Sequence, residues 1–179
     1  AGRALNNDSI QKAKSMIEYL KKNGEEHPKL DKLRDIIGDM DDDEKALVFT
    51  QYRDSTEKIA EELNTEGLNA VKFIGQQGDK GMSQTKQAEV LEAFEEGKFN
   101  VVVSTSIGEE GLDIPAVDYV VFYEPVPSGI RDIQRAGRTG RQEEGTVYVL
   151  IAEDTRDEGH FWSAHHKKKN MNKVLNELK

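Results

Sequence analysis

The segment IQRAGRTGRQ, residues 133–142, places Arg135, Arg138 and Arg141 directly behind Gln134. Guanidinium groups this close repel one another, and the two glycines between them each weaken a helix by about 1 kcal/mol relative to alanine. The dipole of a helix C-terminus favours cations, which would account for one or two of the arginines but not for three. A planar guanidinium matches phosphate oxygens, and an arginine finger neutralises charge on a transferred γ-phosphate. The spacing therefore predicts a phosphate between these side chains.

The chain as a whole is acidic, so this cationic segment is a local feature. The 179 residues carry a formal net charge of −9 at pH 7 and include no cysteine. That charge argues against indiscriminate nucleic-acid binding, although a local basic groove can coexist with an acidic exterior. The lack of cysteine excludes disulfides and thiolate metal sites, and no apolar run approaches the roughly 20 residues of a membrane span. We expect an intracellular globular domain with appendages and without membrane contact.

Five short apolar runs indicate the strands of a sheet that would position the chemistry. They occupy residues 46–50, 70–74, 100–105, 119–123 and 146–151, and their composition is typical of strands buried on both faces. Helical patterns separate them, which predicts an α/β domain with a mainly parallel sheet flanked by helices. Ligands of such sheets bind beyond the carboxyl ends of the strands, so the segments after the strands should carry the site.

Two helices are expected before the first strand. Asp8 or Ser9 would cap the first helix, which would stop at Gly24, and Pro28 would open the second. Each helix shows an apolar stripe with a period of 3.6 residues. The stripes consist of Ile10, Ala13, Ile17 and Leu20 in the first helix, and of Leu30, Leu33, Ile36 and Ile37 in the second.

Local signals predict how the following segments begin. The acidic run at residues 39–44 indicates a solvated loop. Asp54 and Glu57 have the spacing of a capping box, and Ser83 is placed to cap the helix after the second strand.

The arginine segment belongs to an ordered set of motifs. QRAGRTGR resembles motif VI of superfamily 2 helicases, STSIGEEGLDIP (104–115) resembles motif V, ALVFTQYRDS (46–55) resembles motif IV, and FIGQ (73–76) resembles motif IVa. Their order and spacing are similar to those of the second, C-terminal RecA-like domain of these motors. The resemblance implies a P-loop NTPase-like fold that lacks its own Walker A loop, because no G-x-x-x-x-G-K-[ST] sequence occurs here.

Further segments narrow the resemblance to one branch of the superfamily. HPKLDKL (27–33), VVFYEPVPS (120–128) and TRDEGHFW (155–162) are similar to archaeal Hef and the Fanconi anaemia group M helicases. The resemblance covers nearly the whole chain. It implies that residues 1–27 are the tail of a helical insertion or linker, residues 28–155 the RecA-like helicase domain, and residues 156–179 a C-terminal helical extension.

The resemblance implies half of an ATP site. Arg138 and Arg141 would reach the γ-phosphate across an interdomain cleft, Gln134 would sense that phosphate, and Arg135 would pair with acidic residues of the other domain. These four side chains are the expected catalytic residues.

Motif V would complete this half of the nucleotide site. Asp113 would accept hydrogen bonds from the ATP ribose, with Gly111 beside it, although an aspartate before a proline also forms turns or caps helices. No DE-x-H box occurs in the chain. The Mg²⁺ ligand, the phosphate loop and the catalytic carboxylate would therefore come from the N-terminal RecA-like domain of the same protein. We assign no metal ligand here, and we expect the isolated fragment to be an inactive monomer.

The same resemblance implies a nucleic-acid track along the carboxyl edge. Thr105 would bond a phosphate with help from backbone amides near Gly108, although a satisfied strand-terminal hydroxyl is an equal alternative. The remaining expected contacts are Thr50, Arg53, Gly75 and Gln76. Lys167 to Lys169 could touch DNA, but a solvated basic face is the better interpretation of that run.

Departures from the DEAD-box pattern favour a DNA motor. Gln134 stands where that family has histidine, and Glu109 and Glu110 stand where it tends to carry alanine and arginine. The predicted function is the second motor domain of an ATP-dependent helicase or translocase on branched or forked DNA in fork repair. Its location would be the cytoplasm, at the nucleoid in an archaeon, or the nucleus of a eukaryote. The alternatives are the corresponding domain of an RNA helicase or RNA sensor, and a nucleotide-independent binding module, which has no need of paired arginines.

Overall fold

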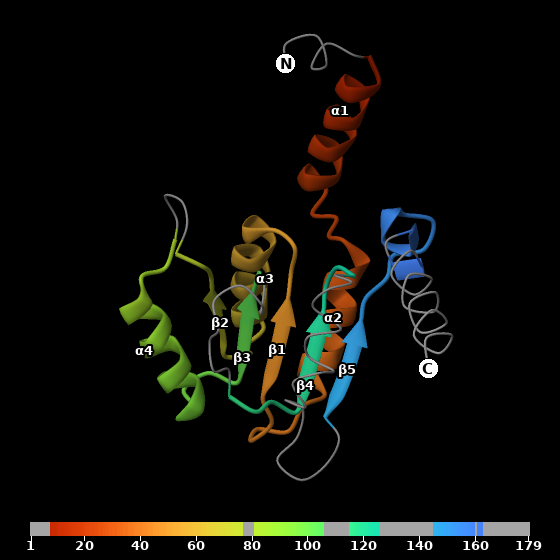
Figure 1. Cartoon of the computed structure of the whole chain (residues 1–179). Helices are drawn as coiled ribbons and strands as arrows, with labels where there is room; N and C mark the ends of the chain where they lie inside the picture. The colour runs from red at the N-terminus through yellow and green to blue at the C-terminus, as the bar shows by residue number, and fades with distance from the viewer. Residues whose placement is uncertain (1–7, 77–80, 106–114, 126–144, 160, 163–179) are drawn as a thin grey trace, which may run out of the picture.

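The computed structural model describes residues 8–76, 81–105, 115–125, 145–159 and 161–162 (Figure 1). Four helices and five strands follow one another along these ranges. The helices are α1 (Asp8–Lys22), α2 (Pro28–Gly38), α3 (Arg53–Thr65) and α4 (Gln84–Glu95), and the strands are β1 (Ala46–Phe49), β2 (Ala70–Phe73), β3 (Val101–Ser104), β4 (Tyr119–Phe122) and β5 (Thr146–Val149).

The five strands form one parallel sheet in the order β2-β3-β1-β4-β5. Ala46 at the start of β1 lies opposite Val101 of β3 and Tyr119 of β4, so the strands are in step and their carboxyl ends share one edge. Figure 1 shows all the arrowheads at that edge. The sheet confirms the expected α/β fold and all five predicted strands. Each strand is four residues long, and the ends of the predicted runs lie just beyond the paired residues.

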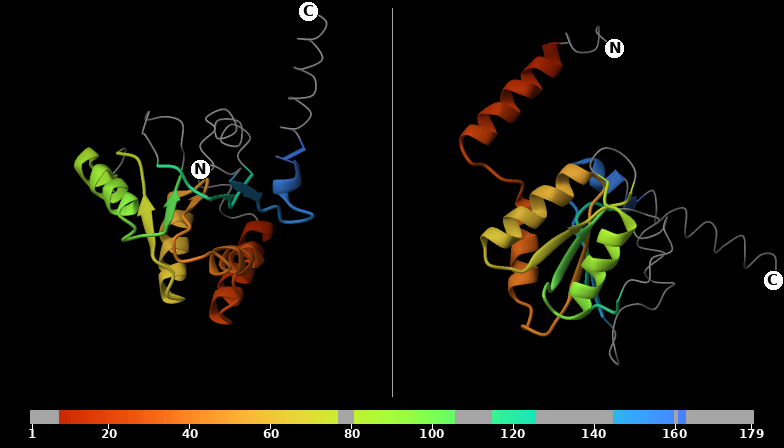
Figure 2. Two further views of the ribbon diagram at one scale, coloured as in Figure 1. Left: turned by 90° about the horizontal axis from the view of Figure 1, so that it is seen from below. Right: turned by 90° about the vertical axis from the view of Figure 1, so that its left-hand side faces the viewer.

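Helices cover both faces of the sheet. Leu33 and Ile37 of α2 and Ile59 and Leu63 of α3 belong to one buried cluster with Val48 of β1. On the opposite face, Val90 and Phe94 of α4 pack with Leu47, Phe49 and Val102. Figure 2 shows the sheet between these two helical layers. The alternation of β1 between the clusters explains why its sequence is apolar throughout.

Helix α1 stands apart from this core. It ends before Gly24, whose φ of +67° suits glycine, as the sequence predicts. Ile17 in its apolar stripe is 52% exposed, whereas Leu33 in α2 is completely buried. Figures 1 and 2 show α1 projecting away from the sheet. Among the described residues no helix is both long and apolar enough to cross a membrane.

Helix ends agree with the sequence in one place and differ in another. Ser83 accepts a hydrogen bond from the Lys86 amide and caps α4, as predicted. The capping box expected at Asp54 is wrong, because α3 begins at Arg53 with Tyr52 as its N-cap and without a side-chain cap. The side chain of Glu57 instead accepts from Lys72 Nζ of β2, at 2.6 Å. Asp54 lies inside the helix, so it does not occupy the N-cap position that a capping box requires.

Candidate functional site

The carboxyl end of β1 holds a pair of buried hydroxyls. Thr50 is completely buried, and its Oγ1 lies 2.8 Å from Oγ1 of Thr56 and 3.0 Å from the carbonyl oxygen of Tyr52. Thr56 is equally buried, and its Oγ1 donates to the same carbonyl. The Thr50 hydroxyl is thus bonded inside the domain and fixes the turn from β1 into α3. The phosphate contact expected of Thr50 stays a prediction.

That turn carries Tyr52 and Arg53 to the surface. Tyr52 is 58% exposed, and Arg53, the first residue of α3, is half-buried. No side chain caps the helix, so its amino end presents backbone N–H groups beside a guanidinium. Asp54 in the first turn of α3 and Glu124 on the Gln51 amide add carboxylates here, so a phosphate would depend on the helix amides and the Arg53 guanidinium.

The loop after β2 is held by a side chain that the sequence analysis missed. Gln87 of α4 is buried, and its Nε2 donates to the carbonyl oxygen of Ile74 at 3.0 Å. The Met82 amide also donates to the carbonyl oxygen of Gly75. Gly75 is half-buried and Gln76 exposed, so both expected contact residues lie on a braced loop. A glutamine at a buried position of a helix needs a hydrogen-bond partner, and this could have indicated that Gln87 bonds to a neighbouring segment.

The expected nucleic-acid contacts within the described ranges follow three adjacent strands. Phe73 of β2 and Phe49 of β1 both align with Ser104 of β3, which lies between them. Thr105 follows Ser104 and is half-buried. Thr105 is therefore about one strand spacing, roughly 4.8 Å, from Ile74 on one side and from Thr50 on the other. The loop of Gly75 and Gln76 and the turn that carries Arg53 begin directly after these two neighbours.

A buried cation joins the end of β4 to the chain beyond β5. Lys29 of α2 is buried, donates from Nζ to the carbonyl oxygen of Tyr123 at 2.8 Å, and pairs with Asp157. Asp157 also accepts from the Ala152 amide. Both charged residues lie in the segments HPKLDKL and TRDEGHFW, which the sequence analysis singled out without assigning them a role. This ion pair anchors the last described residues before 126–144.

Burial perturbs two acidic groups at the same strand end. The carboxylate of Glu124 accepts from the Gln51 amide at 2.9 Å, and burial raises the pKa of this side chain. Burial also raises the pKa of Tyr123 to about 12. Glu124 therefore links the ends of β1 and β4 while it carries a desolvation cost in its charged form.

The cluster that the sequence predicts to bind phosphate lies outside the described residues. This applies to the four motif VI side chains Gln134, Arg135, Arg138 and Arg141, to Gly108, Gly111 and Asp113 of motif V, and to Lys167–Lys169. Within the described ranges, no group of three or more His, Cys, Asp or Glu side chains could hold a metal ion.

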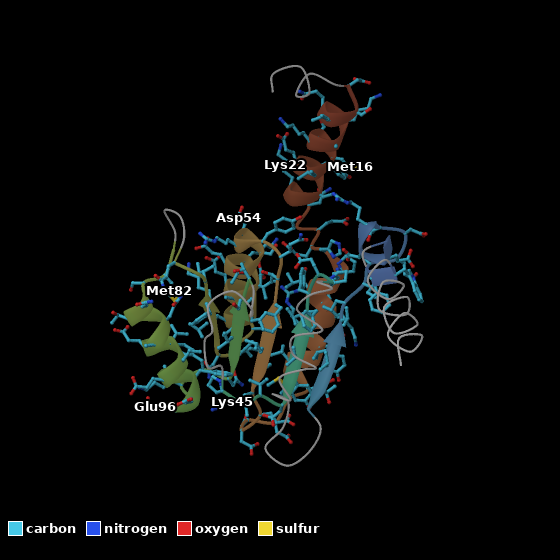
Figure 3. All side chains as sticks on the ribbon, viewed as in Figure 1. Met16, Lys22, Lys45, Asp54, Met82 and Glu96 are labelled. Atoms are coloured by element: carbon cyan, nitrogen blue, oxygen red, sulfur yellow. The ribbon has the colours of Figure 1, made fainter. Side chains whose placement is uncertain are left out.

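The opposite edge of the sheet is hollow and acidic. A cavity of about 410 Å³ lies there, and Figure 3 labels Lys45 and Glu96 at this end, with Asp54 at the other. Nearly every charged group in its lining is a carboxylate. The acidic residues are Asp42, Asp43, Glu44, Glu95, Glu96 and Asp118. Asp42, Asp43 and Glu44 belong to the acidic run that was predicted as a solvated loop, and no sequence pattern indicated the cavity.

An all-parallel sheet with this strand order and helices on both faces is the fold of RecA-like motor domains. The C-terminal domain of the DEAD-box protein Dbp5 has the same fold, with a TM-score of 0.63 and 22% sequence identity, covering 81% of each chain. The family model of the helicase conserved C-terminal domain matches residues 28–143. The chain belongs to this family.

Its relatives share more than the fold. The crystal structure of the Pyrococcus furiosus Hef helicase domain matches with a TM-score of 0.73 and 47% identity, covering 90% of this chain and 34% of that one. A Methanocaldococcus jannaschii protein, provisionally named an ATP-dependent RNA helicase, is 45% identical over 99% of this chain and 23% of its own length. The chicken Fanconi anemia group M protein is 34% identical over 94% of this chain and 9% of its own. The chain spans less than a quarter of each of these two relatives.

Proposed function

We propose that this chain is the second motor domain of an ATP-dependent helicase or translocase that acts on branched DNA. The observation that carries the proposal is the carboxyl edge of the sheet. Thr105, Gly75 with Gln76, and Arg53 all follow the ends of three adjacent strands, which supports a shared role for them at this edge. A row of small polar groups, backbone amides and one guanidinium is suited to a phosphate backbone and carries no obvious sequence readout.

The ATP half of the function rests on motifs V and VI. Arg138 and Arg141 would neutralise charge on the γ-phosphate, Gln134 would respond to its presence, and Arg135 would pair with the other motor domain. Asp113 and Gly111 would hold the ribose. The expected Mg²⁺ and the phosphate loop would belong to the N-terminal RecA-like domain of the same protein. ATP would then draw the two domains together, and hydrolysis would release them, which moves the track along the strand.

DNA is favoured over RNA as the substrate. The resemblance of several segments to the Hef branch, and Gln134 in place of the DEAD-box histidine, support a DNA motor. The name of the Methanocaldococcus jannaschii relative keeps an RNA helicase as the second candidate.

The test uses the complete protein with forked DNA and with duplex RNA of the same length and overhang. ATP hydrolysis and strand separation are measured with each at equal concentration. We expect forked DNA to stimulate hydrolysis and to be unwound, with little response to RNA. Stimulation by RNA alone would replace the proposed substrate, and no stimulation by either would contradict the proposed class of enzyme.

A further inference from the structure

The described residues include six exposed large apolar side chains. Four of them belong to the projecting helix α1: Met16, Ile17, Tyr19 and Leu20. Outside α1 there are two, Tyr52 and Trp162. Trp162 packs edge-on against Phe161. Tyr52 differs, because it lies at the carboxyl end of the central strand, in the middle of the edge described above.

The backbone beneath this ring is held rigidly. The Tyr52 carbonyl oxygen accepts from Thr50 Oγ1 at 3.0 Å, from Thr56 Oγ1 at 3.2 Å and from the Thr56 amide at 3.1 Å. The preceding amide, of Gln51, donates to Glu124 of the neighbouring strand end. Both threonines are completely buried. The fold therefore places an aromatic side chain in solvent on a backbone that has little freedom left to lose on binding.

The chemistry around the ring points to one kind of ligand. Phosphate contacts alone would need only the amides, hydroxyls and guanidinium of this edge, and none of these groups requires an aromatic neighbour. Single-stranded nucleic acids are bound by a combination of such polar groups and exposed rings, on which bases stack without regard to sequence. Tyr52 adjoins Arg53 in the chain, so a phosphate held near Arg53 would bring its own base within reach of the ring.

We propose that the Tyr52 ring is a stacking platform for one nucleobase of the bound strand. This deepens the proposed function, on which it rests, by adding a base contact to a track otherwise made of phosphate contacts. Because any base has a π face, the contact holds the strand without selecting its sequence.

The test compares ordinary and abasic strands. The complete protein is titrated with fluorescent oligothymidine and with an oligomer of the same length made of abasic sites, which keeps the phosphates and removes the bases. Tyr52→Ala should weaken oligothymidine binding roughly tenfold, within the range of stacking losses, and leave abasic binding unchanged. Tyr52→Phe keeps the ring and should bind both strands like the original protein.

Two control variants distinguish failure of the stacking proposal from failure of the proposed phosphate track. Tyr19→Ala removes a tyrosine of α1 with matching exposure, 61% against 58%, and should change neither titration. Arg53→Ala should weaken both strands equally, since it removes a phosphate contact. If Arg53→Ala weakens both strands and Tyr52→Ala changes neither, the stacking proposal is wrong while the track remains. If the original protein binds neither strand, the track itself is wrong.

A direct chemical readout completes the test. Irradiation of the complex with a strand containing 5-iodouracil joins the base to an aromatic ring stacked on it. We expect the modified peptide to contain Tyr52, and Tyr52→Ala to abolish that product. The proposal is overturned if the original protein gives no product at Tyr52 and Tyr52→Ala loses ATP hydrolysis while it binds the strand normally. The ring would then contact another protein domain.

Discussion

The two edges of one sheet carry different chemistry. At the amino edge, six carboxylates surround a cavity of about 410 Å³. At the carboxyl edge, an uncapped helix end, Arg53 and Thr105 form a mixed polar surface, with Asp54 and Glu124 beside them. A parallel sheet makes this division possible, because all strands start at one edge and end at the other. An acidic chain can therefore bind a polyanion at one edge while the rest of its surface repels it.

The largest expected effect concerns the phosphate chemistry assigned to the carboxyl side. In the complete protein, Arg138→Ala should lower kcat for ATP hydrolysis by roughly a thousandfold, as for other arginine fingers. Arg138→Lys should restore little, because a point charge cannot replace a bidentate fork. Glu96→Gln at the amino edge is the control and should leave kcat unchanged. Near-normal turnover by Arg138→Ala would contradict the assignment of phosphate chemistry to the carboxyl side of the sheet.

The next effect tests whether both edges depend on the same core. Leu33 is completely buried in the cluster under α2, and Leu33→Ala should lower the free energy of unfolding by about 2 to 5 kcal/mol. Removing residues 1–26 deletes the exposed helix α1 and one surface ion pair, Glu26 with Lys58, which is worth little. Chemical denaturation of both variants measures the difference. A large loss of stability in the deletion would show that α1 belongs to the core.

A smaller effect should distinguish the edges by their response to salt. Arg53→Ala and Lys98→Ala each remove one cation, the first at the carboxyl edge and the second at the amino edge, where Lys98 pairs with Glu96. A phosphate contact contributes about 1 to the salt slope of DNA binding, so Arg53→Ala should reduce the slope of the complete protein by about that amount. Lys98→Ala should leave it unchanged. Equal slopes in both variants would mean that net charge, and not a defined track, governs binding.

Lys72 on β2 is unsuitable as a control position for this experiment. It has no expected contact with nucleic acid, but its Nζ pairs with Glu57 of α3 at 2.6 Å. Lys72→Glu would place two carboxylates together there, so a change in binding could not be separated from a change in the fold.

The smallest effect concerns acidity at the carboxyl edge. Burial raises the pKa of Glu124 in the folded state, so the folded chain holds this proton more tightly than the unfolded chain. Its favourable contribution is complete below the ordinary carboxyl pKa and is lost as pH rises through the raised value. Glu124→Gln should therefore raise Tm slightly at pH 7 and hardly at pH 4. Glu61→Gln on the exposed side of α3 is the charge-matched control and should show no such difference.

The sequence predicted the architecture better than the details of the site. Strand positions followed from uniformly apolar runs, and the four stripe residues of α2 are buried as expected. The bonds of the Thr50 hydroxyl to Thr56 and Tyr52 could not be predicted, because motif position does not reveal whether a hydroxyl has an internal partner. Lys29 and Asp157 lie at opposite ends of the described core sequence, so no local pattern could show that they meet. The same holds for Gln87, whose bond to Ile74 depends on how α4 packs over β2.

The strand order also sets how this domain must fold. β1 is the first strand in the chain but the central one in the sheet, and both of its neighbours, β3 and β4, come much later. During synthesis the chain therefore exposes β1, its most apolar strand, before any partner strand exists to cover it. Long-range parallel pairing of this kind is slow and leaves strand edges open to association with other chains. Efficient folding of the domain in the cell should consequently depend on keeping β1 from associating with other chains until β3 has been synthesised and can pair with it.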